Sequence, residues 1–365
     1  DIFAQKLKAF SNPVLSREDQ KKLCTYHHKL ILTEVIPAYQ KLADSLESLR
    51  GTGKSSRGLA FFEGGREYYL YLLQSQTGTY VPVGQIEKRM SAQLLSDYRE
   101  ISSLLKQDPS LIDRLNQCSS ELTLTPTQML EKLPELMEKD FPELKDATYE
   151  LRTVHPSMKK FLSPAFYLTP PVDTRSPNVI YINDSGRTSS LELFGTLAHE
   201  GFPGHLYQTV SFAGNNPSDI RYLVTSSGYV EGWATYVEMQ SFSYGCSDTI
   251  IAEIYRLNRS LNLGISSFLD ILIHYYGYDR SQTAKVLSQF GLNGEGTADA
   301  FFNTILEAPA NYLKYYVGYL CFEDLKQAAL KKEGASFSLK NFHKKILETG
   351  PCLFPVLYKY VLQKS

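Results

Sequence analysis

The chain has 365 residues, with 38 Lys and Arg against 39 Asp and Glu, and a formal net charge of −1. Such a balance leaves no excess positive field to release phosphate counterions, which argues against general nucleic-acid binding. No run of about 18 apolar residues occurs, so we expect no transmembrane segment. The length suffices for a sizeable core.

The first residue and the spacing of the cysteines give information on the cellular location of the protein. The chain begins at Asp1 rather than Met, so a signal peptide or a lipoprotein anchor could have been removed upstream. A cytoplasmic and an exported location therefore both stay open, as does the oligomeric state. The cysteines are scattered without a Cys-x-x-Cys pair, which favours free thiols over a disulfide framework: Cys24, Cys118, Cys246, Cys321 and Cys352.

Residues 1–147 are expected to form a helical scaffold or cleft wall. Apolar residues recur at helical spacing over 15–50, and further helices are predicted from residue 64, over 83–107, over 110–118 and over 126–139. Thr125-Pro126 is a typical helix start, and Asp108-Pro109 ends the helix before it. No titratable cluster in this region suggests chemistry.

Residues 148–365 are expected to carry the catalytic site and to form one continuous structural unit with the first region. Several prolines exclude long helices over 148–186, and short strands are predicted at 165–168 and 178–183. A strand here could pair by its free edge with an extended peptide, or it could be an ordinary packing element. Helix resumes at Ser189 and leads into His199.

The motif that carries chemistry is His199-Glu200-Gly-Phe-Pro-Gly-His205, followed by Glu231. Two imidazoles and a carboxylate can bind Zn²⁺ and leave a fourth position open for water. Glu200, next to the first ligand, can then accept the proton of that water. We predict one Zn²⁺ per chain, although Co²⁺ or Mn²⁺ would suit the same ligands.

The spacing of the two histidines makes a geometric prediction. In the usual zinc helix the ligands lie four residues apart on one face, whereas here they lie six apart. Six residues of a regular helix rotate by roughly 240°, which would separate the imidazoles. A shared metal therefore requires a break at 202–204, where Pro203-Gly204 can supply it.

The third ligand is predicted from the following helix. Glu231 opens Glu-Gly-Trp-Ala-Thr-Tyr-Val-Glu238, and two turns place both carboxylates on nearly the same face. We expect Glu231 to bind the metal and Glu238 to orient a ligand imidazole.

These residues resemble a bacterial family, the domain of unknown function 885, which is distantly similar to thimet oligopeptidase-like and carboxypeptidase Taq-like zinc peptidases. The resemblance covers about 60–365 and includes Asp270-Ile-Leu-Ile-His274-Tyr-Tyr-Gly-Tyr and the tyrosine-rich 312–320. It implies a mainly α, gluzincin-type metallopeptidase fold, with a small β-sheet beside a deep cleft that has zinc on its floor. It also implies peptide hydrolysis.

The resemblance also implies roles for residues beyond the metal ligands. In the thimet oligopeptidase-like group a tyrosine-rich helix supplies hydroxyls to the oxyanion. Tyr315-Tyr316-Val-Gly-Tyr319 is similar but has one added residue, so the inward hydroxyl stays open, with Tyr315 favoured. A packed aromatic stripe is the alternative.

Four further residues could contact a substrate or support the fold. His274 could bind the substrate or stabilise the tetrahedral intermediate, or it could pair with Asp270 one turn earlier. Arg256 and Arg259 could receive a peptide's C-terminal carboxylate, although arginines on helices are more often solvated.

The sequence therefore predicts zinc-dependent hydrolysis of short peptides, with Glu200 as the general base. One alternative is an inactive gluzincin-like protein that binds peptide or metal. Another is a zinc hydrolase of a non-peptide amide or ester, because the chemistry at the metal would be the same.

Overall fold

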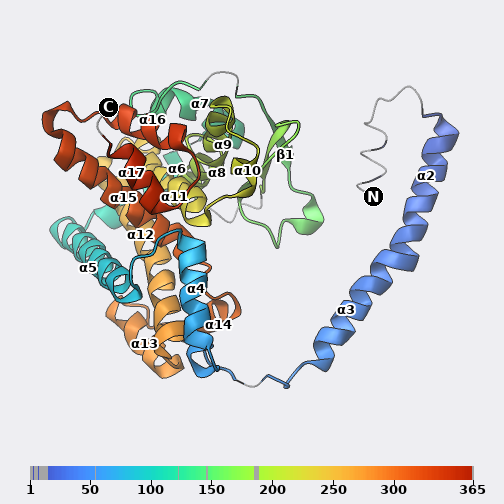
Figure 1. Cartoon of the computed structure of the whole chain (residues 1–365), viewed down its shortest axis with the longest axis horizontal. Coiled ribbons are helices and arrows are strands. Elements are labelled where there is room, and N and C mark those ends of the chain that lie inside the picture. The colour runs from blue at the N-terminus through green and yellow to red at the C-terminus, as the bar shows by residue number, and fades with distance from the viewer. Residues whose placement is uncertain are drawn as a thin grey trace. The chain divides into compact units, whose positions relative to one another are not determined.

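The computed structural model describes residues 3, 7, 15–53, 55–121, 123–144, 147–184 and 189–363, without the side chains of 118–121. The chain forms two compact units, Asp1–Ser56 and Arg57–Ser365 (Figure 1). The helices between residues 57 and 147 pack into the core of the larger unit, together with helices from the second half of the chain.

The smaller unit is helical over the range expected from its periodicity. Helix α2 (Arg17–Leu30) continues through the π-helical segment η1 (Ile31–Val35) into α3 (Ile36–Ser48). Ser16 caps its start, because the hydroxyl accepts a hydrogen bond from the amide of Asp19 at 3.1 Å. None of the residues in these three segments is buried. Their apolar face therefore forms no core within this unit.

The larger unit begins with the short helix η2 (Leu59–Phe61), followed by α4 (Gly65–Thr77), α5 (Val83–Gln107), α6 (Leu111–Glu121) and α7 (Pro126–Met137). The prediction of a helix over 83–107 is confirmed. So is the start at Thr125, whose side chain forms a capping box with Gln128. These helices contribute Tyr69, Met90 and Leu130 to the core.

A small mixed sheet follows, in the proline-rich stretch. Strand β1 (Tyr149–Thr153) runs parallel to β3 (Asn178–Ile182), and β2 (Ala165–Leu168) runs antiparallel to β3 on its other side. The order β1-β3-β2 leaves β2 as an edge strand. The predictions of β2 and β3 are confirmed, whereas β1 was not predicted, although half-buried Tyr149 and Leu151 alternate in it with exposed Glu150 and Arg152.

The rest of the chain is helical, with short connections (Figure 1). The elements are α8 (Ser190–Glu200), α9 (His205–Gly214), α10 (Ile220–Leu223), α11 (Ser227–Gly245), α12 (Thr249–Ile271), η4 (Leu272–Tyr276), α13 (Arg280–Gln289), α14 (Thr297–Glu307), α15 (Leu313–Glu333), η5 (Gly334–Ser336), α16 (Leu339–Thr349) and α17 (Phe354–Val361), with η3 (Pro156–Met158) between β1 and β2. The fold is therefore mainly helical with one small sheet, as the sequence predicted.

Glycines let helices α11 and α15 pack closely. A Cβ atom on Gly232 of α11 would lie 2.5 Å from the carbonyl carbon of Gly318 in α15. A Cβ on Gly318 would in turn lie 2.3 Å from the carbonyl oxygen of Gly228. No side chain fits at these distances, so the two backbones are in direct contact. Glu231 and Tyr315, which flank this contact in the sequence, are positioned by it.

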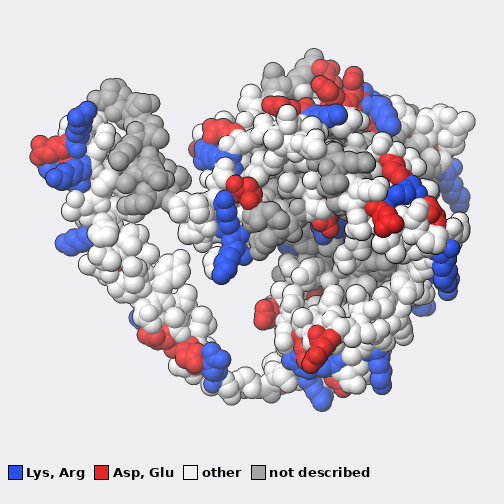
Figure 2. All heavy atoms as spheres, turned by 180° about the vertical axis from the view of Figure 1, so that it is seen from behind, with Lys and Arg blue, Asp and Glu red and all other residues white. Residues whose placement is uncertain are grey.

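Charged side chains of both signs share the surface of the larger unit (Figure 2). Lysine, arginine and acidic side chains are interspersed over the face of the larger unit shown in Figure 2. Among the described helices, none combines the length and the apolar character needed to cross a membrane. The cysteines with described side chains are free thiols, whereas the side chain of Cys118 lies outside the described part: Cys24, Cys246, Cys321 and Cys352.

Candidate metal centre

The two histidines lie on separate helices joined by a tight turn. Helix α8 ends at Glu200, and α9 begins at His205, which confirms the predicted break at 202–204. The turn contains a cis peptide bond between Phe202 and Pro203. A Cβ on Gly204 would lie 1.8 Å from the carbonyl oxygen of His199, so only glycine lets the chain fold back this closely.

A tryptophan of α11 holds this turn in place. The indole of Trp233 is fully buried, and its Nε1–H donates to the carbonyl oxygen of Pro203 at 2.9 Å. Trp233 follows Glu231 by two residues in α11. The hydrogen bond therefore fixes the turn between the histidines relative to the helix that carries the carboxylate.

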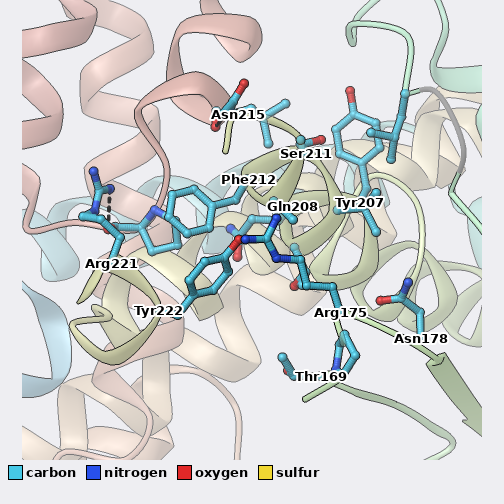
Figure 3. Close-up of a pocket in the computed structure, with 18 of the residues that line it drawn as sticks. Thr169, Arg175, Asn178, Tyr207, Gln208, Ser211, Phe212, Asn215, Arg221 and Tyr222 are labelled. Atoms are coloured by element: carbon cyan, nitrogen blue, oxygen red, sulfur yellow. Dashed lines mark hydrogen bonds between the residues drawn. The ribbon is translucent and has the colours of Figure 1, made fainter. Parts of the chain in front are cut away.

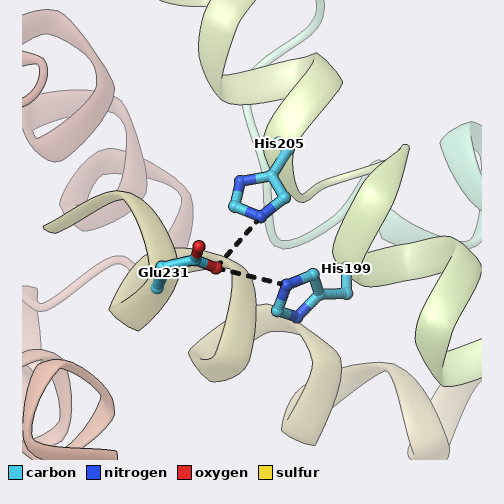
Figure 4. A group of neighbouring side chains, drawn as sticks. All are labelled: His199, His205 and Glu231. Carbon is cyan, nitrogen blue, oxygen red and sulfur yellow. Dashed lines mark ion pairs between the residues drawn. The ribbon is translucent and has the colours of Figure 1, made fainter. Parts of the chain in front are cut away.

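Three side chains meet at one point (Figure 4). The Nε2 atoms of His199 and His205 lie 3.7 and 3.3 Å from the same oxygen of Glu231. One ligand atom from each residue lies within 4.8 Å of the other two. Around a tetrahedral zinc ion with bonds of about 2.0–2.1 Å, ligand atoms lie about 3.3 Å apart. The group has the donor atoms and nearly the spacing of a zinc site, so it could hold a metal ion.

Glu238 contacts the ring nitrogen of His199 that does not face Glu231. Its Oε2 lies 3.0 Å from Nδ1 of His199, on the side of the ring that faces away from Glu231. Arg259 of α12 donates to both oxygens of Glu238, at 2.7 and 3.2 Å. A carboxylate held this way fixes the orientation of the imidazole and leaves Nε2 for a metal.

The electrostatics of the group match a site built for a cation. Burial disfavours the imidazolium of His199, but hydrogen bonds to Glu231 and Glu238 outweigh it and raise its pKa to about 10. Burial likewise opposes the charge of Glu231, yet hydrogen bonds to His199 and His205 hold the pKa of that carboxyl well below its usual range. The carboxylates thus favour positive charge between the side chains, which a proton or a metal ion can supply.

Glu200 lies beside the group and is not one of its three members. Its Oε2 accepts a hydrogen bond from the backbone amide of Tyr167, in the edge strand β2, at 2.9 Å. Glu200, His199 and Ala165 all line one cavity of about 550 Å³, together with residues of α12 and α15. The carboxylate therefore faces a space in which a ligand could approach the metal group.

Of the three tyrosines considered, Tyr315 lines this cavity. Its ring centroid lies 6.5 Å from that of His199, and burial together with the charges of Glu231 and Glu200 raises the pKa of its hydroxyl. Tyr316 is buried, with its hydroxyl 3.3 Å from Ser260. Tyr319 lines a different cavity.

His274 does not lie among the residues of the cavity. Its Nδ1 accepts a hydrogen bond from the amide of Leu59 at 3.1 Å, and its Nε2 lies 3.0 Å from the carbonyl oxygen of Ile305. The ring is 1% exposed and joins η2 to α14. The sequence left a substrate contact and a structural role open for His274, and these two hydrogen bonds are those of a residue that supports the fold.

Asp270 has partners other than the expected His274. It accepts a 2.5 Å hydrogen bond from the hydroxyl of Tyr69, and the amide of Ala310 donates to both of its oxygens at 3.0 Å. The one-turn spacing permitted a pair with His274 as one of two possibilities, but the carboxylate turns toward Tyr69 and the loop before α15. Asp270 is thus a support for that loop.

The two arginines that could receive a peptide's carboxylate, Arg256 and Arg259, each form an ion pair with a glutamate of this chain. Arg256 forms an ion pair with Glu253 at 2.5 Å, one turn away in α12. Arg259 binds Glu238, as described above, and also lines the cavity. The contribution of Arg259 was missed because only the packing of α12 against α11 brings it to Glu238. The amide of Tyr167 was missed because a backbone group leaves no mark in a sequence.

The fold and the His-His-Glu group define a helical protein with a possible metal site. Residues 1–361 match the family described as bacterial protein of unknown function (DUF885). The chain belongs to this family, as its motifs suggested. A comparison with curated proteins gave no match.

Two solved structures share the fold. One, from Colwellia psychrerythraea, is provisionally described as a lipoprotein; it is 20% identical with a TM-score of 0.84, over 99% of this chain and 65% of the other. A second, from Shewanella oneidensis, is likewise provisionally described as a lipoprotein, of unknown function; it is 18% identical with a TM-score of 0.65, over 98% of this chain and 70% of the other. The chain thus spans just under two thirds of the first relative's length.

Proposed function

We propose that this chain is a zinc-dependent peptidase that hydrolyses short peptides in a gluzincin-type cleft. The observation that carries the proposal is the convergence of His199, His205 and Glu231, with the carboxylate of Glu200, which is not a member of the group, facing the cavity that His199 lines. A site with three protein ligands that keeps one position open is typical of catalytic rather than structural zinc.

The bound ion would lower the pKa of a water molecule and polarise the carbonyl of the substrate. Glu200 accepts the proton of the attacking water and passes it to the leaving amine. The hydroxyl of Tyr315 donates a hydrogen bond to the oxygen on which negative charge develops. Glu238 and Arg259 keep the ring of His199 in place throughout.

The edge strand supports a peptide as the substrate. Phe166 and Leu168 alternate with Tyr167, whose amide points away from β3 toward Glu200. An extended peptide that pairs with this edge would lie along the cavity that contains Glu200 and His199. Pairing of this kind recognises backbone and therefore suits peptides of varied sequence.

Metal content is the first test. The native chain, a His205→Ala variant and a control His155→Ala variant are purified without added metal and measured by elemental mass spectrometry. We expect about one zinc per chain in the native and control proteins, and a sharp loss in His205→Ala. His155 is the control because its exposed ring contacts Ser157, away from the group.

Activity against a peptide library then separates the remaining possibilities. Zinc binding with cleavage of peptides supports the proposal. Zinc binding without cleavage of any peptide, but with hydrolysis of small amides or esters, indicates a non-peptide hydrolase. No zinc in the native chain, even after zinc is offered, rejects the catalytic proposal and leaves a binding protein.

A further inference from the structure

A second and larger cavity, of about 790 Å³, lies along α9 (Figure 3). Its walls come from the loop after β2, from 207–215 in and after α9, from 221–230 and from α16. Val172, Phe212 and Leu347 are among its apolar residues. The proposed chemistry at the metal group uses none of these side chains, so the cavity could have a separate role in binding.

Two buried polar atoms of residues that line this cavity have no hydrogen-bond partner within the described part of the chain. Gln208 is 3% exposed, and within the described part of the chain its Nε2 has no hydrogen-bond partner. The buried hydroxyl of Tyr222 is also unpartnered there. Figure 3 shows the side chains of Gln208, Tyr222 and Arg175 pointing toward one another. A buried donor that lacks an acceptor is destabilising, so a cluster of donors indicates that a ligand supplies the acceptor.

Arg175 is the cation whose charge is left for a ligand. Its guanidinium lies 5.2 Å from the ring centroid of Tyr222 and forms no ion pair with a described residue. By contrast, Arg221 donates to two backbone carbonyls, and Lys344 pairs with Glu348.

The backbone around Arg175 is shaped to present this side chain. Its φ is 52°, in the left-handed region that few residues other than glycine adopt. Its amide donates to the carbonyl oxygen of Pro171 at 2.8 Å, which closes the turn. Such a conformation is retained only where the surroundings hold it. The turn fixes Arg175 at the wall of the cavity.

The cavity lies within reach of a peptide bound at the metal group. Ala165 lines the cavity of Glu200, and Thr169, four residues further along, lines this one. Four extended residues span about 13 Å. Gln208 follows His205 by three residues, so the two side chains lie on neighbouring positions of one face of α9. A peptide of about four residues can therefore contact both cavities.

We propose that this cavity binds a carboxylate of the peptide, with Arg175 and Gln208 as donors and the apolar wall against the adjacent side chain. Arginine is suited to this because its guanidinium can bind a carboxylate through two parallel hydrogen bonds. The assignment rests on the proposed function in taking a peptide as the ligand. The carboxylate can come from the C-terminus or from an acidic side chain.

The test measures binding rather than turnover. Calorimetry on the Glu200→Gln chain compares three tetrapeptides: an uncharged sequence with a free C-terminus, its C-terminal amide, and the amide with one aspartate. We expect a peptide that carries a carboxylate to bind at least tenfold more tightly than the neutral amide. Arg175→Met removes this difference, and Arg280→Met keeps it. The side chain of Arg175 is exposed, so we expect its replacement to leave the fold intact.

Each outcome has one meaning. A preference for the free C-terminus alone, lost in Arg175→Met, supports the proposal and identifies the C-terminus as the source. A preference for the aspartate peptide alone, lost in the same variant, supports it with the side chain as the source. Equal binding of all three peptides, no binding, or an equal effect of Arg175→Met on all three overturns it.

The failure of this proposal differs from a failure of the proposed function. Carboxylate-dependent binding in a chain that hydrolyses no peptide keeps the cavity assignment and rejects the peptidase. Hydrolysis of peptides, with binding that does not depend on Arg175, keeps the proposed peptidase function and rejects the cavity assignment.

Discussion

The backbone amide of Tyr167 donates a hydrogen bond to Oε2 of Glu200 at 2.9 Å, joining the edge strand of the sheet to the proposed general base. One carboxylate oxygen is thus held by the strand, and the other stays available to a water molecule. The strand therefore contributes to the orientation of the base as well as to the wall of the cavity.

Replacing Glu200 with Gln tests the base directly. The amide keeps the shape of the side chain and cannot accept the proton, so we expect peptide hydrolysis to fall by at least about 100-fold. Zinc content should be unchanged, since Glu200 is not one of the three residues that could hold the ion. Full activity of Glu200→Gln on a peptide that the native chain cleaves would show that the base is another group.

Tyr315→Phe removes the hydroxyl expected to stabilise developing charge. We expect kcat to fall on the order of 100-fold, with zinc content retained. Tyr319→Phe is the matched control, because Tyr319 lies on the same helix and lines another cavity. Equal losses in the two variants would assign the effect to packing of α15 rather than to the hydroxyl.

Glu238→Gln should weaken metal binding without removing a ligand. The neutral amide binds the ring of His199 less strongly and leaves Arg259 without its carboxylate. Zinc affinity is expected to fall by about 10–100-fold in a chelator competition. Glu323→Gln, which affects an ion pair with Lys326, serves as the control. An unchanged zinc affinity would show that Glu238 does not stabilise the metal site through His199.

Asp270 predicts a pH dependence of stability. Burial raises its pKa to about 7, against the opposing hydrogen bonds from Tyr69 and Ala310. Because the folded value exceeds the unfolded value of about 3.9, folding favours the protonated form. This contribution to stability is present below pH 4 and is lost as the pH rises toward 7 and above.

Urea unfolding at a series of pH values between 4 and 8 measures this effect. The free energy of unfolding of the native chain should fall more steeply over this range than that of Asp270→Asn, which has no proton to lose. Parallel curves for the two proteins would contradict the assignment.

The glycine contact between α11 and α15 predicts a large effect of a single methyl group. Gly232→Ala places Cβ 2.5 Å from a backbone atom of Gly318, so we expect a loss of unfolding free energy on the order of 3 kcal/mol. Gly84→Ala is the control, since a Cβ there meets no atom within 4 Å. It should leave stability the same or raise it by up to about 1 kcal/mol. Similar stabilities of the two variants would show that the helices can separate at little cost.

Much of the helical fold could be predicted from local signals. Helix α5 has a long apolar periodicity, and α7 and α8 start at residues that form capping boxes, so their bounds follow from neighbours in the sequence. The break between His199 and His205 followed from helix geometry. The grouping with Glu231 followed from chemistry.

Contacts between distant segments could not be predicted. Arg259 reaches Glu238, and Leu59 reaches His274, only because helices pack against one another. The preference of Asp270 for Tyr69 over its helical neighbour has the same cause. A spacing of four residues permits a pair, and tertiary packing decides whether it forms.

The backbone contact of Gly232 with Gly318 also limits how the site can open. Glu231 precedes this contact by one residue and Tyr315 by three, so the close approach of the two backbones holds both residues near each other. These two helices form the rigid wall of the site. We therefore expect an opening that admits a ligand on the side of β2, where the amide of Tyr167 donates a hydrogen bond to Glu200. A displacement of that strand would change both the access of a ligand to the cavity and the position of the Glu200 carboxylate.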